Sequence, residues 1–179
     1  KVSAAIGAAS PVLLKPSEWT PSGAQLAFEL LHLVLERHSF PPATAQLIHG
    51  ASQVGSSLSS DPRVRVITFT GGMSAGRAVA RAAAETLAVV QLELGSNNPA
   101  IVLPDADIGR TAELLIAGMT RLNGQWCEAP GKVLVPESLH DDLVEALLAS
   151  AATLNLDHGF RDGTQLGPLA YRAHRERLE

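Results

Sequence analysis

Hydrophobic and polar residues follow two different periods along the chain. Between Ala24 and Glu36, apolar residues recur every three or four positions, a spacing that predicts an amphipathic helix. Val64–Phe69 shows the shorter period, with alternating β-branched residues, and predicts a strand. By the same criteria the other predicted strands are 12–14, 45–48, 89–94, 100–103 and 132–135, and the other predicted helices are 77–87, 108–122 and 139–153. Strands that alternate with helices through short loops favour an α/β fold of mostly parallel sheets with flanking helices.

Residues that typically start or stop helices refine these boundaries. Thr20 followed by Pro21 predicts the N-terminus of the first long helix. Ser138, with Asp141 three residues later, predicts a capping box for helix 139–153. The charged run Arg172–Arg177 predicts one more helical segment at the end of the chain.

A polar, glycine-containing break separates two of the predicted strands. Gly95–Pro99 lies between strand 89–94 and strand 100–103 and contains Gly, Ser, two Asn and Pro. We therefore predict a domain junction here, with one domain in residues 1–94 and another in residues 95–179.

Composition excludes several classes of function. The 179 residues carry a formal net charge of -4 at pH 7 and their Arg residues are scattered, which argues against a nucleic-acid-binding surface. No apolar run reaches the roughly 18 to 20 residues of a membrane span, and no signal sequence opens the chain. The 6 histidines show no metal-ligand spacing, so no metal site is expected. A reducing, cytoplasmic setting is therefore expected.

One thiol and one carboxylate stand out as reactive groups. Cys127 is the single cysteine and cannot form an intrachain disulfide, so its chemistry is expected to be structural, metal-binding or nucleophilic. The alternative to a nucleophile is an inert buried cysteine. Glu93 ends the apolar run 89–94, where burial of a carboxylate is costly without a role. If buried there, Glu93 would have a raised pKa and could act as a general base; the alternative is a side chain that turns outward.

Two further segments have the character of a nucleotide site. Lys15 and Glu18 follow the first strand at its carboxyl end, where open α/β sheets bind ligands, although a solvated loop pair is the plain alternative. Gly71–Gly76 lies between a predicted strand and a predicted helix, so backbone N–H groups there could face a pyrophosphate; the alternative is a tight turn.

Several short motifs, in this order, resemble those of the aldehyde dehydrogenase superfamily. They are Lys15–Glu18, Phe69–Gly76, Glu93–Pro99, Asp105–Asp107, Gly124–Cys127 and Gly167–Leu169. Nearly the whole chain is covered, and the order makes the resemblance specific. It implies an aldehyde-dehydrogenase-like fold in which 1–94 is part of the NAD(P)-binding domain and 95–179 is the first part of the catalytic domain.

The resemblance also implies residue roles. Cys127 would attack an aldehyde and form a thiohemiacetal and then a thioester, and Glu93 would activate the water that releases the acid. The implied cofactor contacts are Lys15 and Glu18 at the adenosine ribose, Gly50 and Gly55 beside the adenine, Gly71, Gly72 and Gly76 at the pyrophosphate, and Leu94. A carboxylate at Glu18 would repel a 2′-phosphate, so NAD is expected, with NADP as the alternative.

The chain departs from the family pattern in ways that bear on activity. Gly72 replaces a serine and Ser96 replaces a glycine, and the family's subunits are more than twice as long. The family's oxyanion-hole Asn, its Glu-x-Phe motif and its oligomerisation arm have no counterpart here. We therefore expect a central fragment, incomplete at both ends and inactive alone, from a homo-oligomeric parent. The alternatives are a non-catalytic relative that binds a nucleotide or a partner, and a thiol acyl transferase or esterase that does not use NAD.

Overall fold

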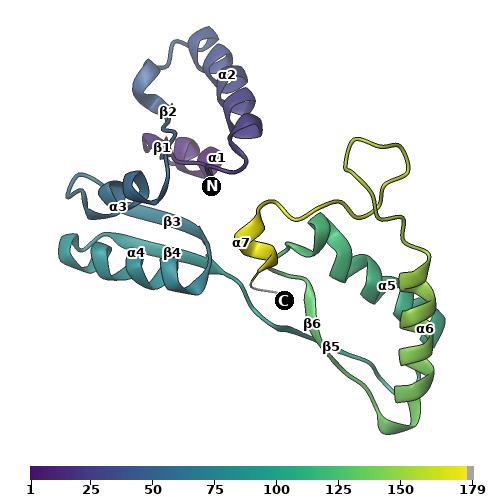
Figure 1. Ribbon diagram of the computed structural model, residues 1–179. Helices are drawn as coiled ribbons and strands as arrows, with labels where there is room; N and C mark the ends of the chain where they lie inside the picture. Colours follow the sequence, from purple (N-terminus) through teal and green to yellow (C-terminus); the bar gives the residue numbers. More distant parts are fainter. Residues whose placement is uncertain (177–179) are drawn as a thin grey trace. The chain divides into compact units, whose positions relative to one another are not determined.

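The computed structural model describes residues 1–176, and the chain divides into two compact units (Figure 1). Unit 1 is Lys1–Leu94, and unit 2 begins at Gly95. Within the described residues there are three two-stranded sheets, and each pairs strands that are neighbours in the sequence. All three pairs are parallel, because each is connected through a helix rather than a hairpin.

The first part of unit 1 is held together by an apolar cluster under one long helix. Its elements are α1 (Val2–Gly7), β1 (Val12–Leu14), α2 (Pro21–Arg37), the 3₁₀ turn η1 (Pro42–Thr44) and β2 (Ala45–Leu47). Pro21 occupies the first turn of α2, where its missing N–H costs no hydrogen bond. Phe28 and Leu35 of α2 are buried against Ala45 of β2, with Val2 and Ile6 of α1 packed on them. This packing places the loop after β1 at the carboxyl end of the strand.

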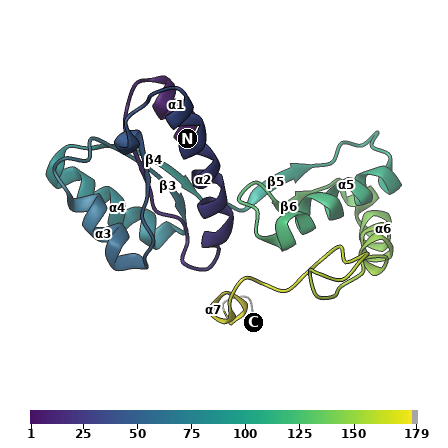
Figure 2. The same cartoon turned by 90° about the horizontal axis from the view of Figure 1, so that it is seen from above.

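The second part of unit 1 is a strand–helix–strand unit preceded by a helix. Its elements are α3 (Ser52–Ser60), β3 (Val66–Gly71), α4 (Met73–Thr86) and β4 (Val89–Leu94). The two helices pack side by side, and α4 also contacts both strands (Figure 2). In β4 the odd positions from Val89 to Glu93 are exposed, while Val90, Leu92 and Leu94 are partly buried. This alternation matches the period of two that a sheet covered on one face requires.

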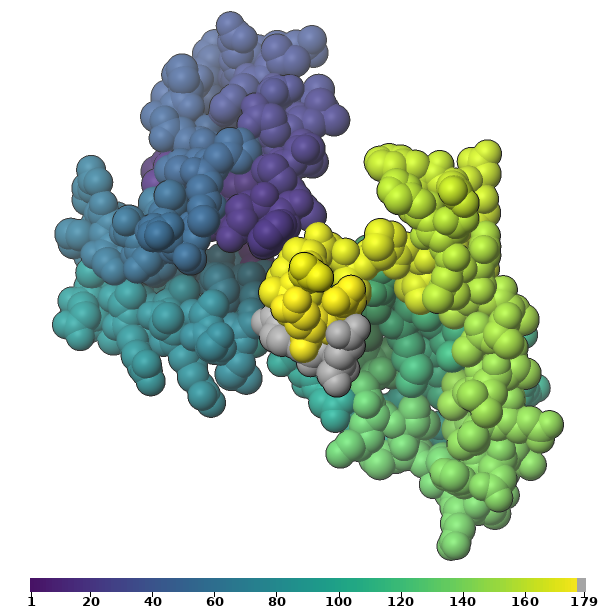
Figure 3. All heavy atoms as spheres, in the orientation of Figure 1, coloured from purple at the N-terminus to yellow at the C-terminus, as the bar shows by residue number. Residues whose placement is uncertain are grey.

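Unit 2 builds a second apolar cluster between a strand pair and two helices. Its elements are β5 (Asn98–Ile101), α5 (Ile108–Thr120), η2 (Arg121–Gly124), β6 (Pro130–Leu134), η3 (Glu137–Leu139), α6 (His140–Ala152) and α7 (Arg172–Arg175). Val102, Ala112, Leu115 and Leu143 form the buried cluster. The loop between α6 and α7 stands out as a yellow-green lobe (Figure 3), and its Phe160 is 96% exposed. Arg177, the last residue of the predicted charged run, lies outside the described residues.

Several predicted boundaries are wrong, for identifiable reasons. Ser138 does not cap a helix: it lies inside the turn η3, in which Leu139 N–H donates to Pro136 O (2.9 Å), and α6 begins at His140 without a side-chain cap. Thr20 precedes α2 but its side chain makes no capping hydrogen bond. Helix α5 ends at Thr120 because Leu122 is left-handed, with φ 52°.

The glycine turn is shorter than expected. Strand β3 continues through Gly71 and α4 begins at Met73, so only Gly72 separates them. No helix among residues 1–176 has the length and apolar character needed to cross a membrane.

Candidate active site

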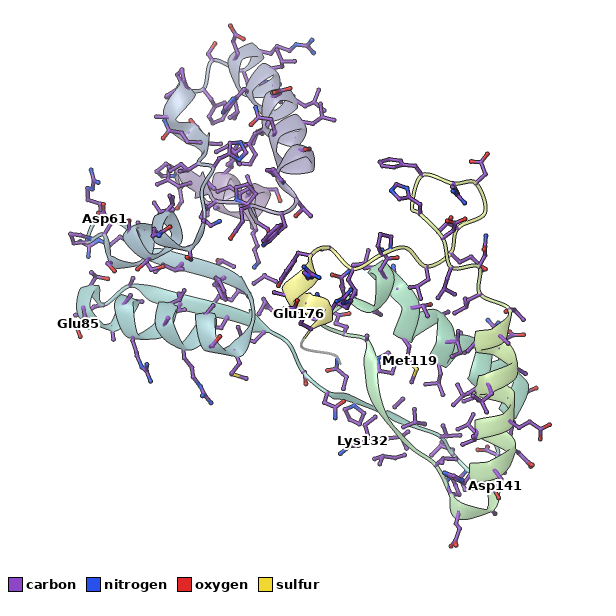
Figure 4. The ribbon with its side chains drawn as sticks, in the orientation of Figure 1. Asp61, Glu85, Met119, Lys132, Asp141 and Glu176 are labelled. Atoms are coloured by element: carbon purple, nitrogen blue, oxygen red, sulfur yellow. The ribbon has the colours of Figure 1, made fainter. Side chains whose placement is uncertain are left out.

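Cys127 lies on a tight turn between α5 and β6. Ala129 N–H donates to Trp126 O (3.0 Å), so Cys127 and Glu128 occupy the two central positions of this turn. The side chain of Cys127 is a free thiol and is exposed. Met119 near the end of α5 and Lys132 on β6 mark the two elements that flank it (Figure 4). The turn therefore presents the thiol outward from unit 2, as a nucleophile requires and an inert buried cysteine does not.

The backbone before this turn is left-handed at three consecutive positions. Leu122, Asn123 and Gly124 have φ values of 52°, 57° and 70°. Non-glycine residues occupy this region at a cost of about 1–2 kcal/mol each. Such a conformation persists only where surrounding contacts enforce it.

Amide side chains supply those contacts by tying the loop to a distant segment. Asn123 Oδ1 accepts from Gly167 N–H (2.9 Å), and its Nδ2 donates to Pro168 O (3.4 Å). Gln125 Oε1 accepts from Ala170 N–H (3.4 Å). The motif Gly167–Leu169 thus borders the loop that leads to Cys127. The sequence alone does not predict that Asn123 and Gln125 hold this loop, because the local pattern contains no sign of hydrogen bonds to residues more than forty positions away.

The ring of Trp126, the residue before Cys127, contacts a positively charged side chain. The Arg121 guanidinium carbon lies 4.9 Å from the Trp126 ring centroid, within cation–π range. The pair brings a positive charge to the loop that bears Cys127.

On the other side of the turn, Asn98 bonds to two of its carbonyl groups. Asn98 Nδ2 donates to Cys127 O (2.7 Å) and to Ala129 O (3.0 Å). Asn98 begins β5 and lies opposite Pro130 in the β5–β6 pair. The register then shifts by one residue, at Gly131, where an added Cβ would collide with Asn97 Oδ1. The start of β6 is therefore closely packed against the Asn97–Asn98 segment.

Glu93 does not meet the expectation of burial. It is exposed on the outward side of β4, where it accepts a hydrogen bond from Gln91 Nε2 (3.3 Å) and pairs in register with Thr70. The alternative, a side chain that turns outward at the strand end, is the one observed, because Gln91 and Glu93 alternate with inward residues. Glu93 belongs to unit 1 and Cys127 to unit 2, so the two residues proposed as catalytic partners lie in different units.

Four of the residues expected at the cofactor lie together around one lysine. Lys15 Nζ donates to Pro16 O (2.6 Å) and Gly50 O (2.8 Å), and lies 3.8 Å from Glu18 Oε2. A Cβ at Gly55 would contact the Lys15 stem at 3.6 Å, so the stem runs over the first turn of α3. Gly50 has φ 153°, and a Cβ there would collide with the Val54 side chain. The lysine thus ties the loop after β1 to the loop after β2.

The other expected cofactor residues gather at the start of α4. Gly76 is buried in its first turn, and a Cβ there would lie 2.7 Å from the Leu94 side chain. Gly71 ends β3 with its Cα facing the Phe69 ring, and Gly72 is exposed with open space around it among the described residues. No side chain in the described part of the chain caps this helix end. Its first N–H groups therefore remain available to an anion.

Two other features of the described residues bear on the chemistry. No group of three or more His, Cys, Asp or Glu side chains within residues 1–176 is arranged to hold a metal ion. A hollow of 740 Å³ lies at the ends of α5 and α6, and its lining includes Leu122 and Asn123 but not Cys127. The thiol itself is therefore on the open turn and not in this hollow.

The comparison with known families decides the identity. The sequence model of the aldehyde dehydrogenase family matches residues 1–179. The chain belongs to the aldehyde dehydrogenase family. The predicted family and the predicted aldehyde-dehydrogenase-like α/β fold are thereby confirmed.

Aldehyde dehydrogenases of known sequence and structure match nearly the whole chain. It is 38% identical to the mitochondrial succinate-semialdehyde dehydrogenase of Arabidopsis thaliana, covering 100% of this chain and 33% of the relative. It is 33% identical to betaine aldehyde dehydrogenase of Bacillus subtilis, covering 100% of this chain and 36% of the relative. This chain thus spans about a third of the length of these aldehyde dehydrogenases.

Solved aldehyde dehydrogenase structures match equally well. A mutant of aldehyde dehydrogenase C from Pseudomonas syringae, in complex with NAD+ and octanal, has a TM-score of 0.92 and 34% identity, covering 99% of this chain and 36% of that one. Betaine aldehyde dehydrogenase from Staphylococcus aureus, in complex with NAD+, has a TM-score of 0.86 and 34% identity, covering 94% of this chain and 33% of that one.

Proposed function

We propose that this chain supplies the nucleophile and part of the cofactor site of an NAD(P)-dependent aldehyde dehydrogenase. The observation that carries the proposal is the exposed Cys127 thiol, the only one in the sequence, on a braced turn in a chain that the family matches throughout. In this assignment residues 1–94 are part of the NAD(P)-binding domain, and residues 95–179 are the first part of the catalytic domain.

Cys127 performs the covalent step. Its thiolate Sγ bonds to the carbonyl carbon of an aldehyde, and the carbonyl oxygen takes the displaced electron pair as a thiohemiacetal. The Cys127 backbone N–H would donate a hydrogen bond to that oxygen. After oxidation the same carbon is held as a thioester on Sγ.

Glu93 performs the hydrolytic step. Its carboxylate takes a proton from water, the hydroxide bonds to the thioester carbon, and the C–S bond breaks to release the acid and the thiolate. Among the described residues the Glu93 carboxylate is exposed and open to water, which this role requires.

The residues around Lys15 and α4 fit a dinucleotide. The open helix start at Gly72 offers backbone N–H groups to a pyrophosphate, and the close Gly76–Leu94 contact shapes this end of the helix. NAD(P), when bound, accepts the hydride from the substrate carbon. Glu18, which is 44% exposed, offers a carboxylate to ribose hydroxyls and disfavours a 2′-phosphate, so NAD is preferred over NADP.

The sequence-based placement of Gly50 and Gly55 beside the adenine belongs to the same proposal. The Gly50 carbonyl accepts a hydrogen bond from Lys15 Nζ, and Gly55 packs against the aliphatic part of the Lys15 side chain. The cytoplasmic location and the homo-oligomeric parent expected from the sequence remain predictions.

Two substitutions test the catalytic assignment in the protein that contains this sequence. Cys127→Ala is expected to abolish aldehyde oxidation while NAD binding is retained. Glu93→Gln is expected to slow thioester hydrolysis by about 10²–10⁴-fold, the usual contribution of a general base, and to leave the initial burst of NADH unchanged. Glu85→Gln, a carboxylate change on α4 of the same unit, is the matched control and is expected to leave both steps unchanged.

Specific outcomes would contradict the proposal. Oxidation that persists in Cys127→Ala would show that another group is the nucleophile. Acylation of Cys127 by an activated ester, with no turnover that depends on NAD, would favour an esterase or acyl transferase. Nucleotide binding without either reaction would favour a non-catalytic relative.

A further inference from the structure

The direction of a side chain is set by the two peptide planes that flank its Cα. For Cys127 these are the Trp126–Cys127 plane and the Cys127–Glu128 plane, each rigid because the peptide bond is planar. Trp126 O accepts from Ala129 N–H (3.0 Å), which holds the first plane. The second plane has its own carbonyl, Cys127 O, and no backbone group bonds to that carbonyl among the interactions described for residues 1–176.

Asn98 provides the missing constraint. Its Nδ2 donates to Cys127 O at 2.7 Å and to Ala129 O at 3.0 Å. Both partners are carbonyl oxygens, which only accept, so the group that faces them has to be the amide NH₂. The two hydrogens of Nδ2 are thereby both used, one on each carbonyl. A single side chain spans the turn from its second position to its last.

The position of Asn98 is itself rigid. It lies in β5, opposite Pro130 of β6, so the sheet pairing places it beside the turn. Gly131, one residue further on, leaves no space for a Cβ because of Asn97, which keeps the two strands close at this end. The amide therefore bonds from a strand to a loop, which is how enzymes commonly hold a reactive loop in place.

We propose that Asn98 is the positioning residue of the Cys127 thiol. It fixes the Cys127–Glu128 plane, so that both planes flanking the Cys127 Cα are held and the Cα–Cβ bond keeps one direction. The inference rests on the proposed function, since it concerns the reach of the thiol to an aldehyde. Asn98 touches neither substrate nor thiol sulfur, and acts only through the backbone of the turn.

The test uses Asn98→Asp, which keeps the shape of the side chain and removes both donors. Asn155→Asp is the matched control, because Asn155 Nδ2 also donates to a carbonyl of unit 2, that of Gly163 (3.0 Å). Cys127 is the only cysteine of these 179 residues, so a nitroxide label attached to it reports on this turn, and Cys127→Ala treated with the same label supplies the background. We expect the label to tumble faster in Asn98→Asp than in the wild type, and to be unchanged in Asn155→Asp.

The second measurement is the pre-steady-state burst of NADH, divided by its amplitude to give a rate per active thiol. We expect this rate to fall by about 10- to 100-fold in Asn98→Asp, because a misplacement of about 1 Å has that effect on catalysis. The NAD dissociation constant should not change. A purely structural role would lower the burst amplitude through unfolding and leave the rate per site unaltered. Asn98→Ala, which also lacks the donors but adds no charge, replaces Asn98→Asp if that variant does not fold.

An unchanged label spectrum in both Asn98 variants would overturn the proposal. So would a mobile label with a burst rate per site equal to that of the wild type. Retained oxidation in Cys127→Ala would instead refute the proposed function, and the label spectra would then decide by themselves whether Asn98 orders the turn.

Discussion

Replacing Lys15 by Met is expected to destabilise unit 1 by about 2–3 kcal/mol. Hydrogen bonds to charged groups contribute about 1.5–3 kcal/mol each, and water molecules can bond to the two carbonyl groups that lose the ammonium, which recovers part of this free energy. The Lys15 ammonium donates to Pro16 O at 2.6 Å and to Gly50 O at 2.8 Å. Its side chain is only 19% exposed. Met keeps the apolar stem that lies over Gly55, so the change removes the donors and little packing.

Glu18→Gln is the matched control for this substitution. The Lys15–Glu18 pair is 3.8 Å apart and the carboxylate is 44% exposed, so losing it should cost no more than about 1 kcal/mol. The two variants thus separate the carbonyl bonds of Lys15 from its ion pair. The expected order is a large loss for Lys15→Met and a small one for Glu18→Gln.

Urea unfolding followed by tryptophan fluorescence measures this difference. The chain has 2 tryptophans, Trp19 in unit 1 and Trp126 in unit 2. In a background in which every other tryptophan, Trp126 included, is replaced by Phe, the signal comes from Trp19, which lies in the loop between Lys15 and α2. Equal free energies of unfolding for Lys15→Met and Glu18→Gln would refute the reasoning, since the carbonyl bonds would then contribute nothing.

Two further changes test the exposed turn before β3 and the strained loop before Cys127. The hydrogen bond from Arg63 lowers the pKa of Asp61 to about 2, so ionised Asp61 stabilises the fold above its usual pKa of 3.8, and this contribution is lost as the pH falls toward 2. Asp61→Asn should therefore lower the melting temperature at pH 6 but hardly at pH 2. An equal shift of the melting temperature at both pH values would contradict this account. Leu122→Gly should stabilise unit 2 by about 1 kcal/mol in urea unfolding, because glycine adopts the left-handed φ of 52° without steric strain. The Leu122 side chain is 67% exposed, so little packing is lost. A clear destabilisation would mean that the packing of Leu122 outweighs the strain.

The element types were predictable from hydrophobic period, but several ends were not. Strand β4 was predicted with its observed bounds, because apolar residues recur along Val89–Leu94 and Gly95 ends the strand. Strand β5 begins at Asn98, two residues before the predicted start at Ala100. Asn98 belongs to the strand because it pairs with Pro130 of β6, and the local hydrophobic pattern does not mark it as a strand residue. Pairing between strands depends on tertiary contacts, which the period along one strand does not contain.

Some residues of the candidate site were likewise predictable from the sequence, and others were not. Lys15, Glu18, Gly50 and Gly55 were expected together from the resemblance, and the structure brings them within contact through the lysine. Asn98 was quoted only as part of a motif, because its bonds to a turn some thirty residues away leave no trace in local sequence. Glu93 shows the opposite case: its outward direction was already present in the alternation with Leu92 and Leu94.

The parallel strand pairs of the described chain have a consequence for synthesis. In each pair the strands are sequence neighbours joined through one long helix, so β1–α2–β2, β3–α4–β4 and β5–α5–β6 follow one another without interleaving. Loop closure costs little more for such a crossover than for a shorter one, and chains emerge from the ribosome N-terminus first. Each block can therefore close as soon as its second strand emerges. The strand pairs of the part that carries Lys15 and the start of α4 are therefore complete before the turn that bears Cys127 has been translated.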